Sequence, residues 1–194
     1  MPRTSRRRAG KSSTFVPLPL WQEAAAFAAR AHRHQVRKDG KTPYISHVVR
    51  VALTISQVFN CHDPIVLCAA LLHDTIEDTT TDYEDLSERF GREVADVVAA
   101  LTKNMALPEE EREQEYDRGL ARADWRARLV KLADTYDNFC DIESMPFEKQ
   151  ETKKEEAHER CVRAIKLAVA DNRPETRAAV EALRALIAPY ERKR

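Results

Sequence analysis

Apolar residues recur at intervals of three and four along most of the chain, a spacing that predicts amphipathic helices. The first such segment covers residues 19–34, where Pro19 suits the first turn of a helix. A second segment covers residues 44–59. Between them the sequence RKDGKTP contains an Asp-Gly dipeptide and a proline, so we expect a tight loop there.

The third segment, DPIVLCAALLHD at residues 63–74, is apolar nearly all round instead of on one face. Asp63 suits the N-cap position of this helix, and Pro64 suits its first helical position. A helix without a polar face has to be surrounded by other elements. We therefore expect this helix at the centre of the protein.

Helical spacing continues through the rest of the chain. Further helices are expected at residues 82–90, 92–103, 105–118, 124–145, 147–170 and 174–188. Glutamate dominates residues 105–118, which indicates an exposed, mobile connector. The pattern as a whole predicts an all-α, single-domain bundle of eight or nine helices.

The composition agrees with this prediction. Only 4 of the 194 residues are glycine, well below the usual share of about 7%. β-Branched residues form no run longer than three, which favours helix over strand. With 43% hydrophobic and 33% charged residues the chain has a globular profile, and its length suits one domain, which we place at residues 15–194.

The charge distribution limits the classes of partner. The 32 basic residues balance the 32 acidic ones, so no overall charge favours nucleic acid or a membrane surface. Residues 1–14 are basic and contain no acidic residue, and we expect a disordered tail there, with a nucleic-acid arm or a targeting peptide as the alternative. The four cysteines lack C-x-x-C spacing and no apolar run approaches the roughly 18 residues of a membrane span, so a cytoplasmic protein is expected.

One polar cluster stands at the end of the central helix. The pair His73-Asp74 closes the apolar 63–74 segment, and Glu77 and Asp78 follow one turn later. Polar groups in such a place need a hydrogen-bond partner, an opposite charge or a cation, because their burial is otherwise costly. The dipeptide alone is compatible with three interpretations: a structural cap, a salt bridge or a metal site.

A second polar cluster lies on the predicted 124–145 helix. Asp134, Asp137, Asn138 and Asp141 fall on one stripe of this helix, with no lysine or arginine between them. If the stripe faces the His73–Asp78 cluster, the carboxylates repel one another unless a metal ion lies between them. Imidazole and carboxylate ligands together suit Mn²⁺, Fe²⁺ or Zn²⁺.

Four blocks of sequence resemble the HD superfamily of phosphohydrolases, and more narrowly the stand-alone small alarmone hydrolases of the RelA/SpoT type. The blocks are AHRHQVRKDGKTPYISH at 31–47, AALLHDTIEDT at 69–79, FGREVADVVAALTK at 90–103 and VKLAD…N at 130–138. They occur in the order that the family shows, which makes this resemblance far more specific than a single His-Asp pair.

The resemblance implies three sets of functional residues. The metal ligands, which in this family usually hold a manganese ion, are His47, His73, Asp74 and Asp134. The catalytic acidic pair is Glu77 and Asp78. The substrate-binding residues, which include a basic pair for the base and phosphates of a nucleotide, are Arg37, Lys38, Tyr44, Lys103 and Asn138.

The chain departs from the family pattern at two places. Val48 replaces a common proline after the first histidine, which alters only how the helix begins. Thr135-Tyr136-Asp137 stands where the family commonly has Arg-Leu-His, which leaves the identity of the substrate open. Because Asp137 is one helical turn from Asp134, we expect it to border the metal or the ribose of the substrate.

The resemblance also implies an activity, namely hydrolysis of a guanosine 3′-pyrophosphate alarmone with release of pyrophosphate. The implied cofactor is a divalent metal ion, most often Mn²⁺, and the implied partner is a small nucleotide. Two alternatives stay open. One is an HD phosphohydrolase for another nucleotide, such as an adenine alarmone or a nucleoside monophosphate, and the other is a catalytically silent nucleotide-binding or antitoxin-like protein.

Overall fold

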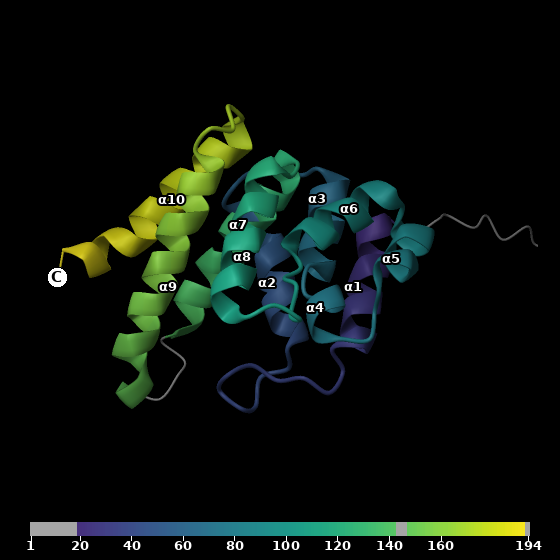
Figure 1. Ribbon diagram of the computed structural model, residues 1–194, viewed down its shortest axis with the longest axis horizontal. Coiled ribbons are helices and arrows are strands. Elements are labelled where there is room, and N and C mark those ends of the chain that lie inside the picture. Colours follow the sequence, from purple (N-terminus) through teal and green to yellow (C-terminus); the bar gives the residue numbers. More distant parts are fainter. Residues whose placement is uncertain (1–18, 143–146, 193–194) are drawn as a thin grey trace, which may run out of the picture.

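The computed structural model describes residues 19–142 and 147–192, and within these ranges the protein is all-α, as predicted (Figure 1). The helices are α1 (Leu20–Ala31), α2 (Ile45–Gln57), α3 (Pro64–Leu72), α4 (Thr75–Asp78), α5 (Tyr83–Phe90), α6 (Arg92–Leu101), α7 (Glu109–Arg122), α8 (Trp125–Asp141), α9 (Phe147–Ala168) and α10 (Pro174–Glu191). Within these ranges nine helices have at least eight residues and α4 is a single turn. The predicted tail at 1–14 lies outside the described residues.

Helix α3 occupies the centre of the bundle, as its sequence predicts. Six of its nine residues are buried, and it packs against α1, α2, α6 and α8. The Asp63 carboxylate caps the helix by accepting hydrogen bonds from the backbone N–H groups of Ile65 and Val66 at 2.8 and 3.2 Å. Pro64 takes the first helical position, where a missing N–H costs nothing.

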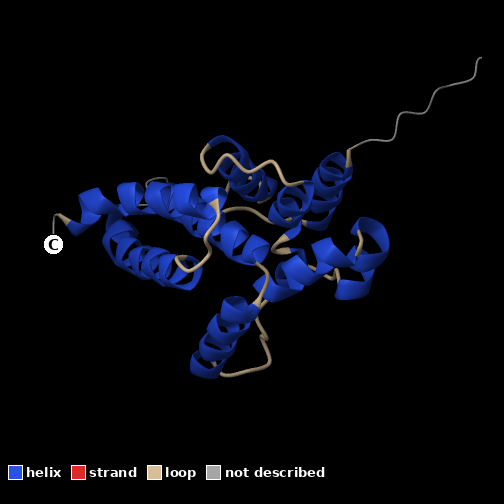
Figure 2. Ribbon diagram, turned by 90° about the horizontal axis from the view of Figure 1, so that it is seen from above, coloured by secondary structure: helices blue, strands red, loops and turns tan. Residues whose placement is uncertain are grey.

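Helices α9 and α10 form an antiparallel pair beside α8, and Figure 2 shows this pair at one end of the molecule. The turn between them, which ends before Pro174, is tied to α8 by a bidentate ion pair. Arg128 donates from Nε and Nη2 to the two carboxylate oxygens of Asp171, each at 2.7 Å. This paired geometry fixes the position of α9 relative to α8, which matters because α9 borders the site described below.

Two predictions about helix bounds need correction. Helix α7 begins at Glu109, after Pro108, and runs to Arg122, whereas we expected residues 105–118. It is also less exposed than its glutamates suggest, because Tyr116 and Leu120 are buried against the bundle. The first helix ends at Ala31, so the residues up to 34 form a turn.

The central helix does not continue through its His-Asp pair. Helix α3 ends at Leu72, and His73 and Asp74 form a turn before the short helix α4. The backbone of both residues nevertheless stays in the right-handed helical region.

Among the described residues, no helix is both long and apolar enough to cross a lipid bilayer.

Candidate active site

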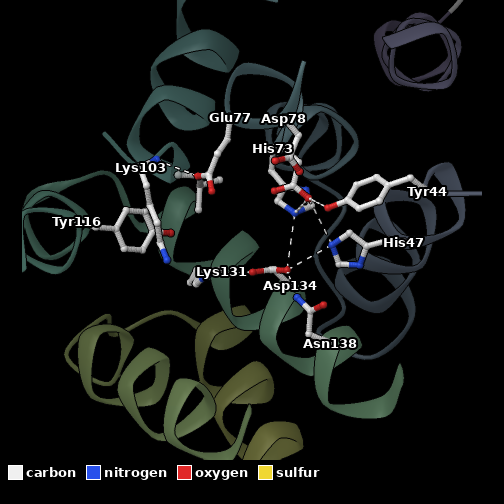
Figure 3. A pocket seen from close by; sticks show the side chains of 12 residues that line it. Tyr44, His47, His73, Glu77, Asp78, Lys103, Tyr116, Lys131, Asp134 and Asn138 are labelled. Atoms are coloured by element: carbon white, nitrogen blue, oxygen red, sulfur yellow. Dashed lines mark hydrogen bonds and ion pairs between the residues drawn. The ribbon is translucent and has the colours of Figure 1, made fainter. Parts of the chain in front are cut away.

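The four predicted metal ligands come from three parts of the chain and lie close together. Figure 3 labels three of them, His47, His73 and Asp134, whose side chains point toward one another. His47 lies on α2, His73 and Asp74 form the turn between α3 and α4, and Asp134 lies on α8. We refer to these four residues as the His-Asp cluster. Helix α2 packs against both α3 and α8, and this packing brings together side chains that are far apart in the sequence.

The distances within the His-Asp cluster match those between ligands of one ion. Nε2 of His47 lies 3.3 Å from Oδ1 of Asp134 and 3.6 Å from Oδ2 of Asp74. Nε2 of His73 lies 3.0 Å from Oδ2 of Asp74 and 3.8 Å from Oδ1 of Asp134. Ligand atoms that are each about 2.0–2.2 Å from an ion are about 3.0–3.6 Å from one another in regular coordination. Three of the four distances lie in this range and the fourth is slightly longer, and the ligand atoms of His47, His73 and Asp134 all lie within 4.8 Å of one another. These three residues can therefore hold a divalent metal ion, with Asp74 beside them.

The hydrogen bonds of the two imidazoles support the same conclusion. Nδ1 of His47 bonds to Oδ2 of Asp137 at 2.7 Å, and Nδ1 of His73 bonds to the backbone carbonyl oxygen of Ala70 at 2.9 Å. Both acceptors require a hydrogen on Nδ1, so each Nε2 points into the cluster, where its deprotonated form can bind a cation. Nε2 of His73 is buried and makes no hydrogen bond of good geometry, although Oδ2 of Asp74 lies 3.0 Å away. A buried nitrogen in this state is what a bound cation would satisfy.

The carboxylate of Asp134 is ionised by its surroundings. Its oxygens accept hydrogen bonds from Lys131 Nζ at 2.9 Å and from Asn138 Nδ2 at 2.6 Å. Burial opposes the charge, but Lys131 and the two imidazoles outweigh it and hold the pKa of Asp134 well below its usual value. On the other side of the cluster, the Tyr44 hydroxyl donates to Oδ2 of Asp74 at 2.6 Å.

The predicted acidic pair lies on α4, beside the His-Asp cluster. Glu77 and Asp78 line the same cavity of about 170 Å³ as the four cluster residues. One oxygen of Glu77 accepts a hydrogen bond from the backbone N–H of Lys103 at 2.9 Å, which fixes the direction of the carboxylate. Burial raises the pKa of Glu77. A carboxylate that is held in place and partly desolvated is suited to proton transfer.

The predicted substrate-binding residues divide into two groups. Tyr44, Lys103 and Asn138 line the cavity, whereas Arg37 and Lys38 do not. Arg37 is 7% exposed, and its guanidinium donates to Asn138 Oδ1 at 2.9 Å and to Asp141 Oδ2 at 3.0 Å. Lys38 is exposed, with its ammonium group towards α9. Without substrate, Arg37 therefore supports the cavity wall from behind.

Sequence reasoning missed the role of Arg50. Its guanidinium donates to both oxygens of Asp137, at 2.6 and 2.9 Å, and to Oδ1 of Asp141 at 3.1 Å. Two of the three carboxylates on the α8 stripe are thus neutralised by arginines from outside α8. The signal was present in the sequence, because Arg50 stands one helical turn after His47 and faces α8 with it.

Of the two places expected for Asp137, the structure favours the one beside the metal ligands over the one at the ribose. It is 4% exposed and does not line the cavity, because its carboxylate points at His47 and Arg50. It is neither a surface residue nor a group at the substrate ribose. Its position is that of a carboxylate that orients a histidine ligand from behind.

This position predicts an effect of Asp137 on metal affinity. In Asp137→Asn the amide keeps the size of the side chain but loses the charge opposite the His47 N–H. Loss of a residue that orients a metal ligand typically lowers metal affinity by about 10–100-fold. We expect a loss of this size in a competition titration with a metal chelator, while Asp96→Asn, at an exposed position of α6 outside the cavity lining, leaves the affinity unchanged. Equal affinities in the two variants would contradict this role.

Comparison with known proteins places this site in a family. A family model described as an HD domain matches residues 24–160. A guanosine-3′,5′-bis(diphosphate) 3′-pyrophosphohydrolase MESH1 from Xenopus tropicalis is 44% identical over 121 residues, which are 62% of this chain and 68% of that protein. The MESH1 protein of Homo sapiens is 43% identical over 121 residues and the same shares of the two chains.

Two solved structures share the fold. One is described as a metazoan ortholog of SpoT that hydrolyses ppGpp; it has a TM-score of 0.78 and 30% identity, with 91% of this chain and 98% of that chain covered. The other is lmo0812 from Listeria monocytogenes, with a TM-score of 0.60, 25% identity, and 77% and 96% of the two chains covered. The resemblance predicted from the sequence is thus confirmed, and the chain belongs to the HD-domain family.

Proposed function

We propose that this protein hydrolyses a nucleoside 3′-pyrophosphate of the (p)ppGpp type and releases pyrophosphate. The observation that carries the proposal is the cavity of about 170 Å³ in which a His-Asp cluster and an acidic pair face each other. The similar MESH1 proteins are named guanosine-3′,5′-bis(diphosphate) 3′-pyrophosphohydrolases and match over 68% of their length. Relatives named as a GTP diphosphokinase or a GTP pyrophosphokinase match over only 18% of theirs. All residues that line this cavity lie within residues 24–160, the range that the HD-domain model matches.

In this proposal a divalent ion, with Mn²⁺ as the first candidate, is held by the His-Asp cluster. Such an ion would acidify a water molecule and offset the negative charge of the phosphoryl oxygens. The remaining work falls to side chains. Glu77 accepts a proton from the attacking water, and the adjacent Asp78 helps to orient that water. Lys131 stays paired with Asp134 and keeps this ligand ionised.

The reaction breaks the bond between the ribose 3′ oxygen and the nearer phosphorus. Water adds to that phosphorus as one of its protons passes to Glu77, and the 3′ oxygen leaves with a proton taken from solvent. Glu77 then returns its proton to solvent. The products are pyrophosphate and a nucleotide with a free 3′ hydroxyl. Lys103, Tyr44 and Asn138 line the cavity and contact the phosphoryl and ribose groups, and Arg37 with Lys38 lies on the side where we place the base.

The experiment that tests this function measures the products from a panel of nucleotides. The panel contains guanosine and adenosine 3′,5′-bis(diphosphates), the corresponding 5′-diphosphates and the monophosphates. We expect pyrophosphate and GDP in equal amounts from the guanosine bis(diphosphate), loss of activity after chelation, and its return with Mn²⁺. Release of orthophosphate instead of pyrophosphate, or no turnover of any 3′-pyrophosphate, would contradict the proposal.

The same panel decides which base the enzyme prefers. The residues that depart from the family pattern do not reach the cavity of the His-Asp cluster. Tyr136 packs edge-on against Phe59 with ring centroids 6.3 Å apart, and the Thr135 hydroxyl bonds to backbone carbonyl oxygens of its own helix. These contacts give no reason for a shift in substrate preference away from guanine. We therefore expect the guanosine bis(diphosphate) to be turned over with a higher kcat/KM than the adenosine compound.

A further inference from the structure

The cavity of the His-Asp cluster is too small for a whole nucleotide with two diphosphate groups. Its volume is about 170 Å³, whereas pockets for ligands of this size usually have about 300–1,000 Å³. The rest of the substrate therefore has to lie in a neighbouring space. Two further cavities, of about 110 and 640 Å³, share Lys103 and Lys131 with the first one, so all three adjoin at this pair of lysines.

Helix α9 forms the far wall of both neighbouring cavities, and Arg160 lines each of them. The larger cavity mixes six cationic with five acidic side chains and so has little preference for an anion. The smaller one is different. Its charged residues are Lys103, Lys131, Arg160 and Asp134, and that carboxylate is already bonded to Lys131. A volume of about 110 Å³ is several times that of a water molecule, about 30 Å³, and admits a phosphoryl group.

Two more cations lie near Arg160, although neither of them lines the smaller cavity. Lys38, in the loop before α2, lies close enough to Arg160 and Lys153 on α9 that these like charges, after burial, lower the pKa of its ammonium group. Lys153 and Arg160 share a counter-ion, because Glu156 bonds to Lys153 at 2.7 Å and to Arg160 Nη2 at 3.4 Å. Convergence of like charges is unfavourable unless an anion binds among them.

We infer that Arg160 is a specificity-determining residue, which binds the non-reacting 5′-phosphate groups of the nucleotide in the small cavity beside the His-Asp cluster. The inference rests on the proposed function, because it takes the 3′-pyrophosphate to lie at the cluster. The 5′-phosphates are then the remaining anions of the substrate. Arg160 is half-exposed, and its 3.4 Å contact with Glu156 is long, so its guanidinium is free to turn and bind phosphate with two parallel hydrogen bonds.

The test uses three substrates that differ only at the 5′ position: guanosine 3′-diphosphates with a 5′-diphosphate, a 5′-monophosphate or a 5′-hydroxyl group. In Arg160→Gln we expect kcat/KM for the 5′-diphosphate to fall about tenfold, mainly through KM, because a half-exposed charge-assisted contact is lost. For the 5′-hydroxyl substrate we expect a change of less than about twofold, within the range of most surface substitutions. Arg160→Lys should keep part of the difference, because it retains the charge but not the planar fork.

Lys166→Gln on the same helix is the matched control, because Lys166 is exposed and lines neither cavity. It should leave all three substrates unchanged. Equal losses for all three substrates in Arg160→Gln, or no loss for any of them, would overturn the inference while leaving the proposed function in place. If the wild-type protein releases pyrophosphate from none of the three substrates, it is the proposed function that fails.

Discussion

Replacement of Asp134 by alanine is expected to remove the metal ion from the His-Asp cluster while the helical bundle stays folded. Asp134 supplies one ligand atom within reach of both imidazoles, and it is the only carboxylate of the α8 stripe that faces them without an arginine partner in the described structure. Because loss of an outer-shell partner alone costs about 10–100-fold in metal affinity, loss of this ligand should cost at least about 10²-fold. Elemental analysis after gel filtration measures the effect, and circular dichroism checks the helices.

Asp141→Ala is the matched control for this experiment. Asp141 lies on the same stripe of α8, two turns further on, but its carboxylate is bonded to Arg37 and Arg50 and not to the cluster. The Asp141→Ala variant should therefore retain about one metal ion per chain, which is also what we expect for the wild type. His73→Ala should behave like Asp134→Ala. Full metal occupancy in both of these variants would show that the ion, if present, lies elsewhere.

Much of the fold could be predicted from the sequence because its strongest signals are local. The central helix α3 was recognisable by an apolar surface on all sides and by Asp63 and Pro64 at its start. Helix α7 was harder, because its average composition is acidic and the two residues that it buries, Tyr116 and Leu120, are too few to dominate the pattern. Composition averages over a helix, whereas packing depends on individual faces.

Nine of the eleven predicted site residues line one cavity, and Arg37 and Lys38 do not, but the charge balance of the site could not be predicted. Periodicity could place Asp134 and Asp137 on one stripe, but it could not reveal which groups face that stripe from other helices. The structure supplies Arg50 to Asp137, and Arg37 and Arg50 to Asp141. The repulsion that we expected a metal to relieve is therefore relieved mostly by arginine, and only the Asp134 end of the stripe is left for a cation.

Conversion of Glu77 to glutamine should separate substrate binding from turnover. The side-chain oxygen of glutamine can still accept the hydrogen bond from the backbone N–H of Lys103, so the cavity keeps its shape. The amide cannot take up a proton, however, and general-base assistance is typically worth about 10²–10⁴-fold. We expect kcat to fall by at least about 10²-fold with KM within a few-fold of the wild-type value, measured as pyrophosphate release with saturating Mn²⁺.

The control for Glu77→Gln makes the same change, glutamate to glutamine, at a position outside the cavity. Glu88→Gln on α5 does this, because Glu88 is exposed and does not line the cavity, and its kcat should equal that of the wild type. Metal content should be the same in all three proteins, since Glu77 is not a member of the His-Asp cluster. If Glu77→Gln turns over at the wild-type rate, the proton goes elsewhere, and Asp78, which lines the same cavity, becomes the group to test by Asp78→Asn. A loss of metal in Glu77→Gln would instead make this glutamate a ligand, and the division between the cluster and the acidic pair would be wrong.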